Sequence, residues 1–543
     1  MDIQQVNRDY QIARSEYKLD IPSDFNFAFD VIDQRGQETD DIAVIAVSRD
    51  GSKIKNVTYT KFSEDSNRLA NALTALGIKK GDFGCVVIGR VPSWYTVLFA
   101  CMKIGAVSMP GTNLLTAKDI AYRIQKSEAR FIVVTPEHCP KFEEIRDQCP
   151  TIEHCIVVGG SYPGWLSLET LLEASSPVFD RSVAASTSSS DMMMAYFTSG
   201  TTSQPKMVPR DYAYGLAHAA TALFWMDSRK GDVHWTLTDT GWAKAAWGLL
   251  FPPLLAGAKV VLYDGEGAFD PIFHLNMIEK LSVSTFCAPP TIYRLFAQQD
   301  LEPYNFSTLR RSLGAGEPLN PEVIRYWEEH TGNVIADGYG QTETINIVGN
   351  FPGMEIRYGS MGLPVPGFDI DIIDDNGKRL PDGEVGHIAV NTENEWPAGL
   401  FDGYYTGSDP DKSSFSHNWY YTGDTARRDK DGYLWFEGRA DDLISSGGYR
   451  ISPFEVESAL LEHPEVVESA VIGIPDETRG QLVKAFIILK SQDMASESLA
   501  AEIQDFCKNL TAPYKYPREV EFVAALPKTI SGKIRRVELR AEN

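Results

Sequence analysis

The chain has 543 residues, 43% of them apolar and 11% aromatic, which is long enough for several packed domains. Its formal net charge of −23 opposes broad affinity for a phosphate backbone, because that kind of binding depends on neutralising Lys and Arg side chains. Nucleic acids and anionic membrane surfaces are therefore not expected partners.

The seven cysteines are scattered and contain no CxxC pair, which fits a reducing compartment better than a disulfide framework. Residues 1–20 mix acids with bases around no apolar segment, so they match no signal or transit peptide. The longest apolar run, residues 245–263, is interrupted by Pro252, Pro253 and Lys259 and is not expected to cross a membrane. We expect a cytoplasmic enzyme, and the sequence leaves open whether it is a monomer or a homodimer.

From about residue 60 the pattern alternates between helix and strand, which predicts parallel sheets covered by helices. Leu69, Leu73 and Leu76 mark one face of a helix that stops at Gly77. A helix is expected over residues 94–106, and another opens with a Thr116–Asp119 capping box. A further helix is expected at 321–330, and strands are expected at 84–89, 131–135, 154–160, 234–238, 259–263, 284–290, 312–318 and 333–340.

Beyond about residue 365 the pattern changes to hairpins, with turns at Asn376-Gly377 and Asp431-Gly432. Residues 438–450 are polar and contain glycine, which predicts a linker. A compact α+β unit follows, opening with Ser452 as N-cap and Pro453 at the first helical position. The sequence thus predicts an α/β fold: a large domain, 1–440, of doubly wound sheets with a β-barrel-like subdomain, then a small α+β domain, 441–543.

One loop, TSGTTSQPK at residues 198–206, suits a polyphosphate because it combines hydroxyls, backbone amides around Gly200 and the cation of Lys206. It is not a Walker loop, since Pro205 and Met207 stand where that motif needs glycine and a hydroxyl. Taken alone, the loop is equally compatible with a Ser/Thr-rich surface loop.

Three further segments favour the nucleotide interpretation. DGYGQTE, residues 337–343, follows an expected strand, and ligands of α/β sheets bind at such strand ends. YTGD ends in Asp424, whose carboxylate can accept both hydroxyls of a ribose, and PKTISGK places Lys533 in a glycine-bearing turn. In this order the four segments resemble the adenylate-forming superfamily, which includes acyl-CoA synthetases, nonribosomal peptide adenylation domains and firefly-type luciferases. The resemblance covers nearly the whole chain and is closest to medium-chain acyl-CoA synthetases.

The resemblance implies a reaction in two steps. A substrate carboxylate attacks the α-phosphorus of ATP, pyrophosphate leaves with Mg²⁺, and the thiol of coenzyme A then attacks the acyl-adenylate. The substrate class it implies is medium-length straight-chain, branched or aromatic acids. Because the first step brings two anions together, it needs cations and aligned donors.

The resemblance also assigns nucleotide-binding roles. Thr342 would contact the α-phosphate, Glu343 would hold Mg²⁺, Asp424 would bind the ribose, and Arg439 would support ribose or phosphate. Lys533 would neutralise charge at the α-phosphate, so that Lys533, Thr342 and Arg439 form the catalytic group. The remaining ATP- and AMP-binding positions are Thr198, Ser199, Gly200, Thr201, Thr202, Ser203, Gln204, Pro205 and Lys206 for the phosphates, and Gly316, Glu317, Pro318, Asp337, Gly338, Tyr339, Gly340 and Gln341 along the adenine side.

For the second step the resemblance implies a rotation of the small domain about a hinge at Asp441, which removes Lys533 from the site. The positions matching coenzyme A contacts are Gly447, Gly448, Tyr449, Arg479, Tyr516, Pro517 and Arg518, and residues 508–543 are locally basic. The acyl substrate would meet Trp242, Gly314, Ala315 and Arg450.

Two departures from the family pattern stand out: Ser203-Gln204 replaces a second glycine of the phosphate loop, and Gly447-Gly448-Tyr449 replaces a more frequent SGY.

The His and Cys residues between 138 and 155 match no common zinc spacing, and His218 and His234 suggest no hydrolase triad. Two alternatives stay open: an adenylating enzyme that loads a carrier protein in trans, and a nucleotide-binding regulator without catalysis.

Overall fold

The computed structural model describes residues 9–182, 184, 186–198, 204–265, 267–316, 321–447, 449–476, 478–528 and 534–542. They form two compact units: a larger one within 1–198, 206–368 and 395–413, and a smaller one within 199–205, 369–394 and 414–543. A domain boundary between residues 440 and 441 stays a prediction.

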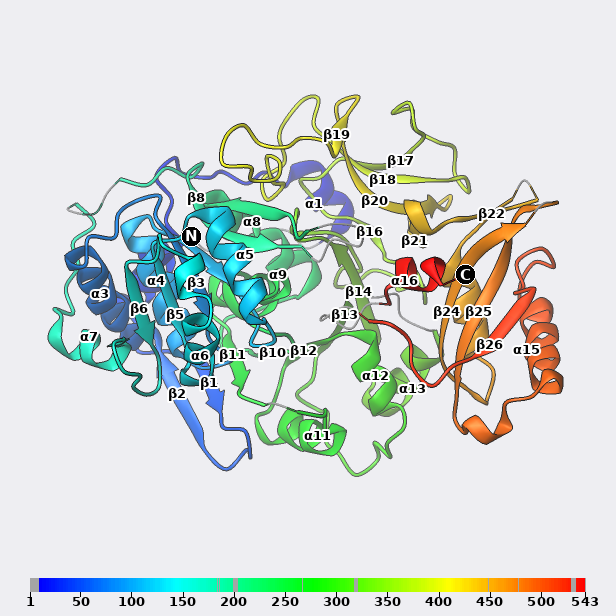
Figure 1. Cartoon of the computed structure of the whole chain (residues 1–543), viewed down its shortest axis with the longest axis horizontal. Helices are drawn as coiled ribbons and strands as arrows, with labels where there is room; N and C mark the ends of the chain where they lie inside the picture. The colour runs from blue at the N-terminus through cyan, green and yellow to red at the C-terminus, as the bar shows by residue number, and fades with distance from the viewer. Residues whose placement is uncertain are drawn as a thin grey trace. The chain divides into compact units, whose positions relative to one another are not determined.

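The first sheet of the larger unit has the strand order β7-β6-β5-β3-β4-β8-β9 and is parallel except for the β8–β9 pair (Figure 1). Apolar side chains of α5 and α6 pack with those of β3 and β5 in one core. The strands are β3 (Phe83–Val87), β4 (Val107–Pro110), β5 (Phe131–Val134), β6 (His154–Val157), β7 (Leu166–Ser167), β8 (Met192–Phe197) and β9 (Met207–Asp211).

The helices that accompany this sheet begin and end largely where the sequence predicts. Thr116 and Asp119 form the expected capping box of α5, and Leu69 and Leu73 of α3 are buried. The helix α3 begins earlier than expected because Thr58 caps it by accepting a hydrogen bond from the Lys61 N–H group. The α-helices before β8 are α1 (Tyr10–Glu16), which contacts β16 of the second sheet, and α2 (Gln34–Glu38), α3 (Tyr59–Ala75), α4 (Ser93–Ile104), α5 (Ala117–Ser127), α6 (Cys139–Glu143) and α7 (Leu168–Ala174).

The second sheet of the larger unit has the order β16-β15-β14-β13-β12-β10-β11-β1-β2. The six neighbouring strands β14, β13, β12, β10, β11 and β1 run parallel to one another. The strands are β1 (Ile42–Val47), β2 (Ile54–Thr58), β10 (Val233–Thr236), β11 (Lys259–Tyr263), β12 (Thr285–Ala288), β13 (Arg311–Ala315), β14 (Ile335–Gly340), β15 (Asn346–Gly349) and β16 (Leu363–Pro364). Its helices are α8 (Tyr212–Ala217), α9 (Ala243–Ala245), α10 (Phe251–Ala256), α11 (Pro271–Lys280), α12 (Pro290–Phe296) and α13 (Pro321–Thr331). Side chains of α11, α12 and α13 share one aromatic-rich core with this sheet, in which Phe296 packs on Trp327. The parallel sheets covered by helices confirm the predicted fold class.

The smaller unit begins with an antiparallel sheet in the order β17-β18-β20-β19, with β21 paired to β20. Its strands are β17 (Ile370–Ile373), β18 (Val385–Asn391), β19 (Phe415–Ser416), β20 (Trp419–Arg428) and β21 (Leu434–Arg439). Gly377 and Gly432 have φ values of 79° and 91°, which explains why the sequence places glycine at both predicted turns.

The rest of the smaller unit is an α+β structure. Its strand β25 is antiparallel to β24 and β22 and parallel to β26. Successive residues of β24 point to opposite faces: Val471 enters a core with α14 and α15, whereas Ala470 and Ile472 enter one with α16. The elements are β22 (Ile444–Ser446), β23 (Tyr449–Ile451), α14 (Pro453–Leu461), β24 (Val466–Asp476), β25 (Gly480–Leu489), α15 (Glu497–Leu510), β26 (Glu519–Phe522) and α16 (Arg536–Ala541).

The segment expected to be a polar linker contains regular structure. A 3₁₀ turn, Ala440–Asp442, is followed by the β22–β23 hairpin, in which Ile444 and Ile451 are paired and fully buried. Its serines and glycines obscure this hairpin in the sequence, because the pairing depends on β25.

All seven cysteines are described, and each is a buried free thiol. Among the described residues, no helix combines the length and apolarity needed to cross a bilayer.

Candidate active site

The predicted phosphate loop closes a hairpin between β8 and β9. Phe197 pairs with Met207, and the N–H group of Thr198 donates to the carbonyl of Lys206 at 2.9 Å. Both ends of the loop are thereby fixed to the edge of a sheet. Residues 199–203, which include Gly200 and the unusual Ser203, lie outside the described residues.

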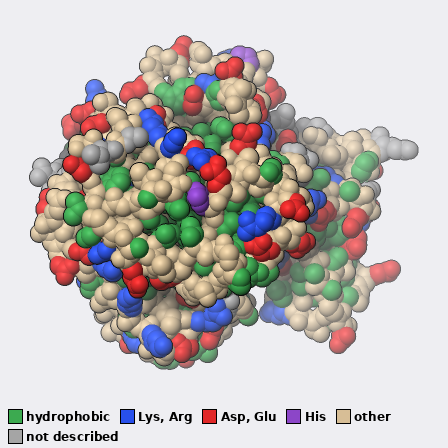
Figure 2. Space-filling view, turned by 60° about the vertical axis from the view of Figure 1, so that its left-hand side comes forward, with side chains coloured by type: hydrophobic (Ala, Val, Ile, Leu, Met, Phe, Trp, Pro, Cys, Tyr) green, Lys and Arg blue, Asp and Glu red, His purple; other side chains and the backbone are tan. Residues whose placement is uncertain are grey.

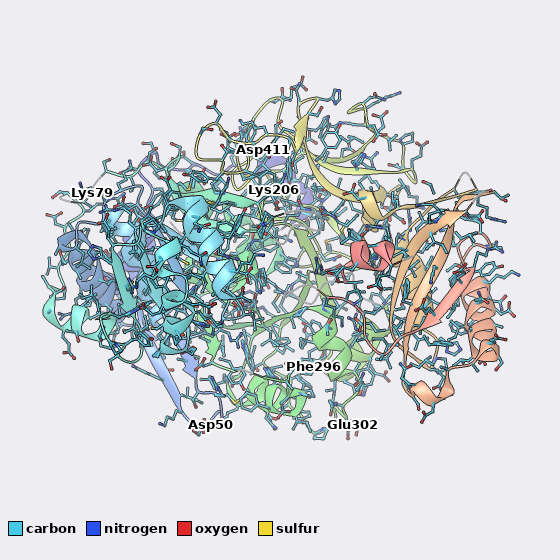
Figure 3. All side chains as sticks on the ribbon, in the orientation of Figure 1. Asp50, Lys79, Lys206, Phe296, Glu302 and Asp411 are labelled. Atoms are coloured by element: carbon cyan, nitrogen blue, oxygen red, sulfur yellow. The ribbon has the colours of Figure 1, made fainter. Side chains whose placement is uncertain are left out.

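Lys206 contacts an aromatic ring and an acid, both from the segment 395–413 of the same unit. Its ammonium group lies 4.2 Å from the centroid of the Tyr404 ring and 3.7 Å from Asp411 Oδ2 (Figure 3). Side-chain and backbone hydrogen bonds from Ser413, helped by Lys206, hold the pKa of Asp411 below its usual range. Asp411 is therefore an acidic partner for Lys206 within the chain.

The ends of β13 and β14 bring the expected acyl and adenine residues together. Gly314 pairs with Asp337, and Ala315 pairs with Gly338. Burial raises the pKa of the Asp337 carboxyl to about 8, although Lys244 opposes the shift. Gly316 has a φ of 106°, which favours glycine, and Glu317 and Pro318 lie outside the described residues.

The glycines of the DGYG segment permit close packing. A Cβ on Gly340 would lie 2.2 Å from the carbonyl of Ile345, and one on Gly338 would lie 2.4 Å from the Trp225 ring. The chain then turns back into β15, with the Gln341 N–H group donating to the Thr344 hydroxyl at 2.9 Å. The half-buried Tyr339 lies on β14, and Thr342 and Glu343 follow it on this turn.

Glu343 is buried and held at both its backbone and its side chain. Its carbonyl accepts hydrogen bonds from Arg210 Nη1 at 2.8 Å and from the Phe401 N–H group at 2.9 Å. Its Oε1 accepts a hydrogen bond from the Tyr404 hydroxyl at 2.9 Å. Tyr404 therefore contacts both the Glu343 carboxylate, through its hydroxyl, and the Lys206 ammonium group, through its ring.

This arrangement suits a magnesium ion that arrives with a nucleotide. Mg²⁺ in phosphate-transfer sites is held by one or two carboxylates and by substrate phosphates. Within the described ranges, no group of three or more His, Cys, Asp or Glu residues could hold a metal. Glu343, which shares Tyr404 as a partner with Lys206, thus fits Mg²⁺ only when phosphate oxygens complete the coordination.

The expected acyl-pocket residues come from β13 and from the turn after β10. Trp242 is half-buried and precedes α9, from which Lys244 Nζ donates to the carbonyl of Ala315 at 3.0 Å. This bond links the turn that carries Trp242 to the strand that carries Gly314. In the smaller unit, Arg450 lies on β23 opposite Ser445.

Asp424 and Arg439 face each other across the β20–β21 hairpin, as registered partners. Arg439 Nη1 lies 3.1 Å from Asp424 Oδ1, and the Asp424 N–H group donates to Thr422 Oγ1 at 3.2 Å. The residue expected at the ribose, Asp424, and the residue expected at the ribose or phosphate, Arg439, are therefore adjacent.

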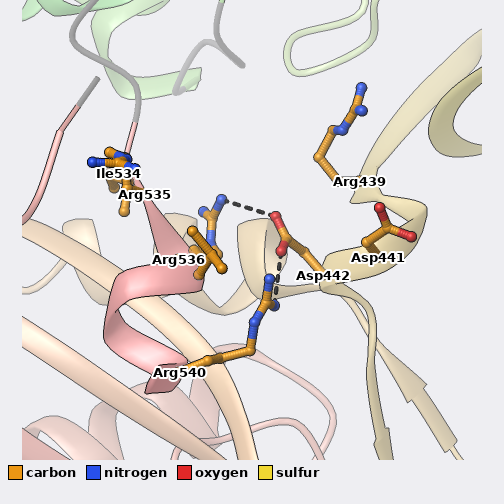
Figure 4. Close-up of a pocket in the computed structure, with 8 residues that line it drawn as sticks. Arg439, Asp441, Asp442, Ile534, Arg535, Arg536 and Arg540 are labelled. Atoms are coloured by element: carbon orange, nitrogen blue, oxygen red, sulfur yellow. Dashed lines mark hydrogen bonds and ion pairs between the residues drawn. The ribbon is translucent and has the colours of Figure 1, made fainter. Parts of the chain in front are cut away.

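The predicted hinge lies beside a pocket lined by Arg439, Asp441, Asp442, Ile534 and the start of α16 (Figure 4). Asp442 forms ion pairs with Arg540 at 2.8 Å and with Arg536 at 3.5 Å. Arg536 also binds both carboxylate oxygens of the buried Glu457 at 2.7 Å. Lys533 lies outside the described residues, directly before Ile534, which bridges to Lys528.

The residues expected to contact coenzyme A lie in two groups. The Gly447 N–H group donates to the carbonyl of Arg479 at 2.9 Å, which places these two residues together. Tyr449 stacks on Tyr514 at 4.1 Å, and the Arg518 guanidinium lies 4.1 Å from the centroid of the Tyr516 ring. Pro517 lies between Tyr516 and Arg518, and Gly448 is outside the described residues.

The structure adds residues that the sequence did not single out, namely Arg210, Lys244 and Tyr404. Each contacts an expected site residue through tertiary structure, and none belongs to a recognised motif. The visible face of the larger unit mixes acidic and basic side chains rather than showing one charge (Figure 2).

Two family models match the chain: "AMP-binding enzyme" over residues 32–405 and "AMP-binding enzyme C-terminal domain" over residues 455–533. Acyl-coenzyme A synthetase ACSM3, mitochondrial, of Mus musculus is 42% identical, over 98% of this chain and 93% of its own. Acyl-coenzyme A synthetase ACSM4, mitochondrial, of Rattus norvegicus is 44% identical, over 96% and 91%. Among solved structures, the anthranilate CoA ligase AuaEII in complex with anthranoyl-AMP has a TM-score of 0.87 and 33% identity, over 96% of this chain and 98% of its own.

Proposed function

The chain belongs to the family of AMP-binding enzymes, and from this premise we propose that it is an ATP-dependent acyl-CoA synthetase. It joins a carboxylic acid to coenzyme A and releases AMP and pyrophosphate, which makes it an AMP-forming acid–thiol ligase. Similarity to acyl-CoA synthetases over almost the whole chain supports this function over carrier-protein loading and over a regulator without catalysis.

The observation that carries the proposal is the joining of Lys206 and Glu343 through Tyr404. A cation and a carboxylate contact the same tyrosine, and the cation ends a loop that is rich in hydroxyls and amides. This is the set of groups that a polyphosphate and its magnesium ion require. A regulator without catalysis would not need the carboxylate beside the loop.

In the first step the substrate carboxylate attacks the α-phosphorus of ATP. Lys206 and the loop 198–206 bind the leaving phosphates, Thr342 contacts the α-phosphate, and Lys533 neutralises the charge that builds at that centre. Asp424 and Arg439 hold the ribose, and Asp337 lies along the adenine. When bound, Mg²⁺ neutralises phosphate charge, and Glu343 is the residue that would hold it.

In the second step the thiol of coenzyme A attacks the acyl carbonyl, and AMP leaves. We propose that residues 441–543 turn about Asp441 between the two steps, so that different residues of this domain serve each one. The glycines of segment 447–449 would border the thiol, and Arg479 and Arg518 would bind phosphates of coenzyme A.

The acid is proposed to be of medium length, branched or aromatic. Trp242 with Gly314 and Ala315 would form an apolar wall that leaves room for such a tail. One methylene in an apolar pocket is worth about 1 to 3 kcal/mol, so neighbouring chain lengths should differ by one to two orders of magnitude in kcat/KM.

The test is a panel of linear acids from C3 to C12, with branched and aromatic acids added. Each is incubated with ATP, Mg²⁺ and either coenzyme A or a pantetheinylated carrier protein, and AMP and thioester are measured. Acid-dependent AMP with acyl-CoA as the product supports the proposal. Thioester on the carrier alone would favour the carrier-loading alternative, and no acid-dependent AMP with any acid would contradict adenylation.

The cytoplasm remains our proposed location. The buried free thiols fit any reducing compartment, and the two relatives described above are named as mitochondrial proteins. Fractionation of the source cells distinguishes the two compartments.

A further inference from the structure

Tyr404 lies between two side chains to which the proposed function gives different tasks, Lys206 for pyrophosphate and Glu343 for its metal. It belongs to the segment 395–413, which is not part of any motif singled out in the sequence. Its aromatic ring and its hydroxyl each contact one of the two side chains. The inference drawn from this contact rests on the proposed function.

The backbone of Tyr404 is fixed. Its N–H group donates to the carbonyl of Asp411, and the Asp411 N–H group donates back to the carbonyl of Tyr404, both at 2.9 Å. The Tyr404 ring also packs edge-on against Phe401, with centroids 4.9 Å apart. Since the Phe401 N–H group donates to the carbonyl of Glu343, the segment is attached to Glu343 at two points.

The hydroxyl of Tyr404 sets the direction of the Glu343 carboxylate. It donates to Oε1 at 2.9 Å, and a charge-assisted hydrogen bond of this kind limits rotation of the carboxylate. Residues that hydrogen-bond to a metal-ligating side chain commonly fix the orientation of that side chain and affect how tightly the site binds the metal. Loss of the hydroxyl should therefore weaken metal-dependent binding.

The ring of Tyr404 acts on Lys206 instead. The ammonium group lies 4.2 Å from the ring centroid, within the range of a cation–π contact, and 3.7 Å from Asp411. Asp411 is the residue whose backbone pairs with Tyr404, so ring and acid hold the ammonium from one short piece of chain. Loss of the ring should weaken the binding of pyrophosphate with or without metal.

We propose that Tyr404 is a positioning residue that aligns the Lys206 ammonium and the Glu343 carboxylate on one magnesium–pyrophosphate group. The two halves of its side chain have separable effects. The hydroxyl orients the carboxylate, and the ring supports the cation.

The experiment compares Tyr404→Phe, which keeps the ring, with Tyr404→Leu, which removes both contacts. The control is Tyr405→Phe, because Tyr405 follows in sequence but packs its ring against Phe83. Pyrophosphate binding to the full chain is measured by calorimetry with Mg²⁺ and with EDTA. The Mg²⁺ concentration for half-maximal ATP–pyrophosphate exchange is measured in parallel.

For Tyr404→Phe we expect about tenfold weaker binding of magnesium pyrophosphate and a similar rise in the half-saturating Mg²⁺ concentration, with binding in EDTA changed less than about twofold. For Tyr404→Leu we expect weaker binding in both conditions. Tyr404→Phe should add nothing to the Mg²⁺ dependence in a Glu343→Gln background, because the two act through one interaction.

Unchanged magnesium pyrophosphate binding in Tyr404→Phe would overturn the inference, as would equal weakening in EDTA or an additive effect in the Glu343→Gln background. These outcomes are distinct from failure of the proposed function. In that case the parent chain itself would show no acid-dependent exchange.

Discussion

Two aspartates that we assign to the same nucleotide have different surroundings. Asp337, in the larger unit, ends a strand of a parallel sheet, and burial raises its pKa to about 8. Asp424, in the smaller unit, lies in an antiparallel hairpin with Arg439 3.1 Å away. Both side chains are shielded from solvent, Asp424 more than Asp337, and Asp424 in addition has an arginine as its ion-pair partner.

The cations near the candidate site residues of the two units also have different partners. In the larger unit, the buried Arg210 and the half-buried Lys244 donate to backbone carbonyls, those of Glu343 and Ala315. In the smaller unit, an ion pair between Asp442 and Arg536 joins the turn of the predicted hinge to α16. Bonds to backbone carbonyls fix chain geometry, whereas side-chain pairs can exchange partners. We propose that the larger unit supplies fixed groups of the site and that residues 441–543 supply the groups that change between the two steps.

The largest effect is expected from Lys533→Ala. It should lower acid-dependent ATP–pyrophosphate exchange by at least about a hundredfold, because one charge-stabilising donor is lost from the adenylation step. Thioester formation from supplied acyl-adenylate should persist, since Lys533 has no task in that step. Loss of both activities in a folded variant would contradict the assignment of this residue to one step.

Arg210→Met should cause the next largest change, measured as stability. Arg210 is 2% exposed, and its guanidinium donates to the carbonyls of Glu343 and Gly399. We expect urea unfolding to show a loss of about 3 to 5 kcal/mol, because two buried carbonyls lose their charged donor. Arg229→Met, at an exposed arginine, is the control. A difference below 1 kcal/mol between the two would break the contrast drawn for the larger unit.

Glu457→Gln tests the ion pairs of the smaller unit. Both Glu457 oxygens accept from Arg536, and the Val471 N–H group donates to Oε1 at 2.7 Å. We expect a loss of about 2 to 3 kcal/mol, because the guanidinium keeps its buried position without a full counter-charge. Glu465→Gln, at a residue near the surface, serves as control. An equal loss in both variants would mean that the pair does not anchor α16.

Asp337→Asn should give the smallest effect and one that depends on pH. An unfolded aspartate titrates near pH 3.9, whereas the folded carboxyl titrates at about 8, so the folded state binds the proton more tightly. The free energy of unfolding of the parent chain should therefore fall as pH rises between these values and level off above them.

The Asn variant cannot ionise, so its stability relative to the parent should increase from pH 5 until about pH 8 and then level off. We expect this increase to reach about 1 to 2 kcal/mol, a value discounted because Asp337 is only half-buried. Urea unfolding at pH 5, 7 and 9 measures the difference. Parallel pH profiles would show that burial does not control this carboxyl.

Much of the fold followed from local signals in the sequence. The capping residue Thr116 and the turn glycines Gly377 and Gly432 act on their immediate neighbours, and the structure confirms each of them. At Ser452 the expected cap is present, because its hydroxyl accepts a hydrogen bond from the Glu455 N–H group at 3.1 Å. The Glu455 carboxylate itself accepts from Lys515 at 2.6 Å, a contact between residues 60 positions apart that local sequence signals do not reveal.

The site was predictable only where a motif carries it. Asp424 was expected at the ribose and Arg439 at the ribose or phosphate, and the hairpin register makes them neighbours. Tyr404 and Arg210 could not be predicted, because their contacts with Glu343 join residues 61 and 133 positions apart in the chain. The β22–β23 hairpin was hidden for the same reason, since its stability comes from β25 rather than from its own residues.

The central claim is that this chain activates an acid through a separate adenylation step. Its most direct test is a single-turnover experiment with excess enzyme, radiolabelled ATP and an accepted acid, first without and then with coenzyme A. We predict one pyrophosphate and one enzyme-bound acyl-adenylate per turnover before coenzyme A is added, and acyl-CoA with AMP afterwards. Formation of ADP and phosphate, or no pyrophosphate until coenzyme A is present, would contradict the claim.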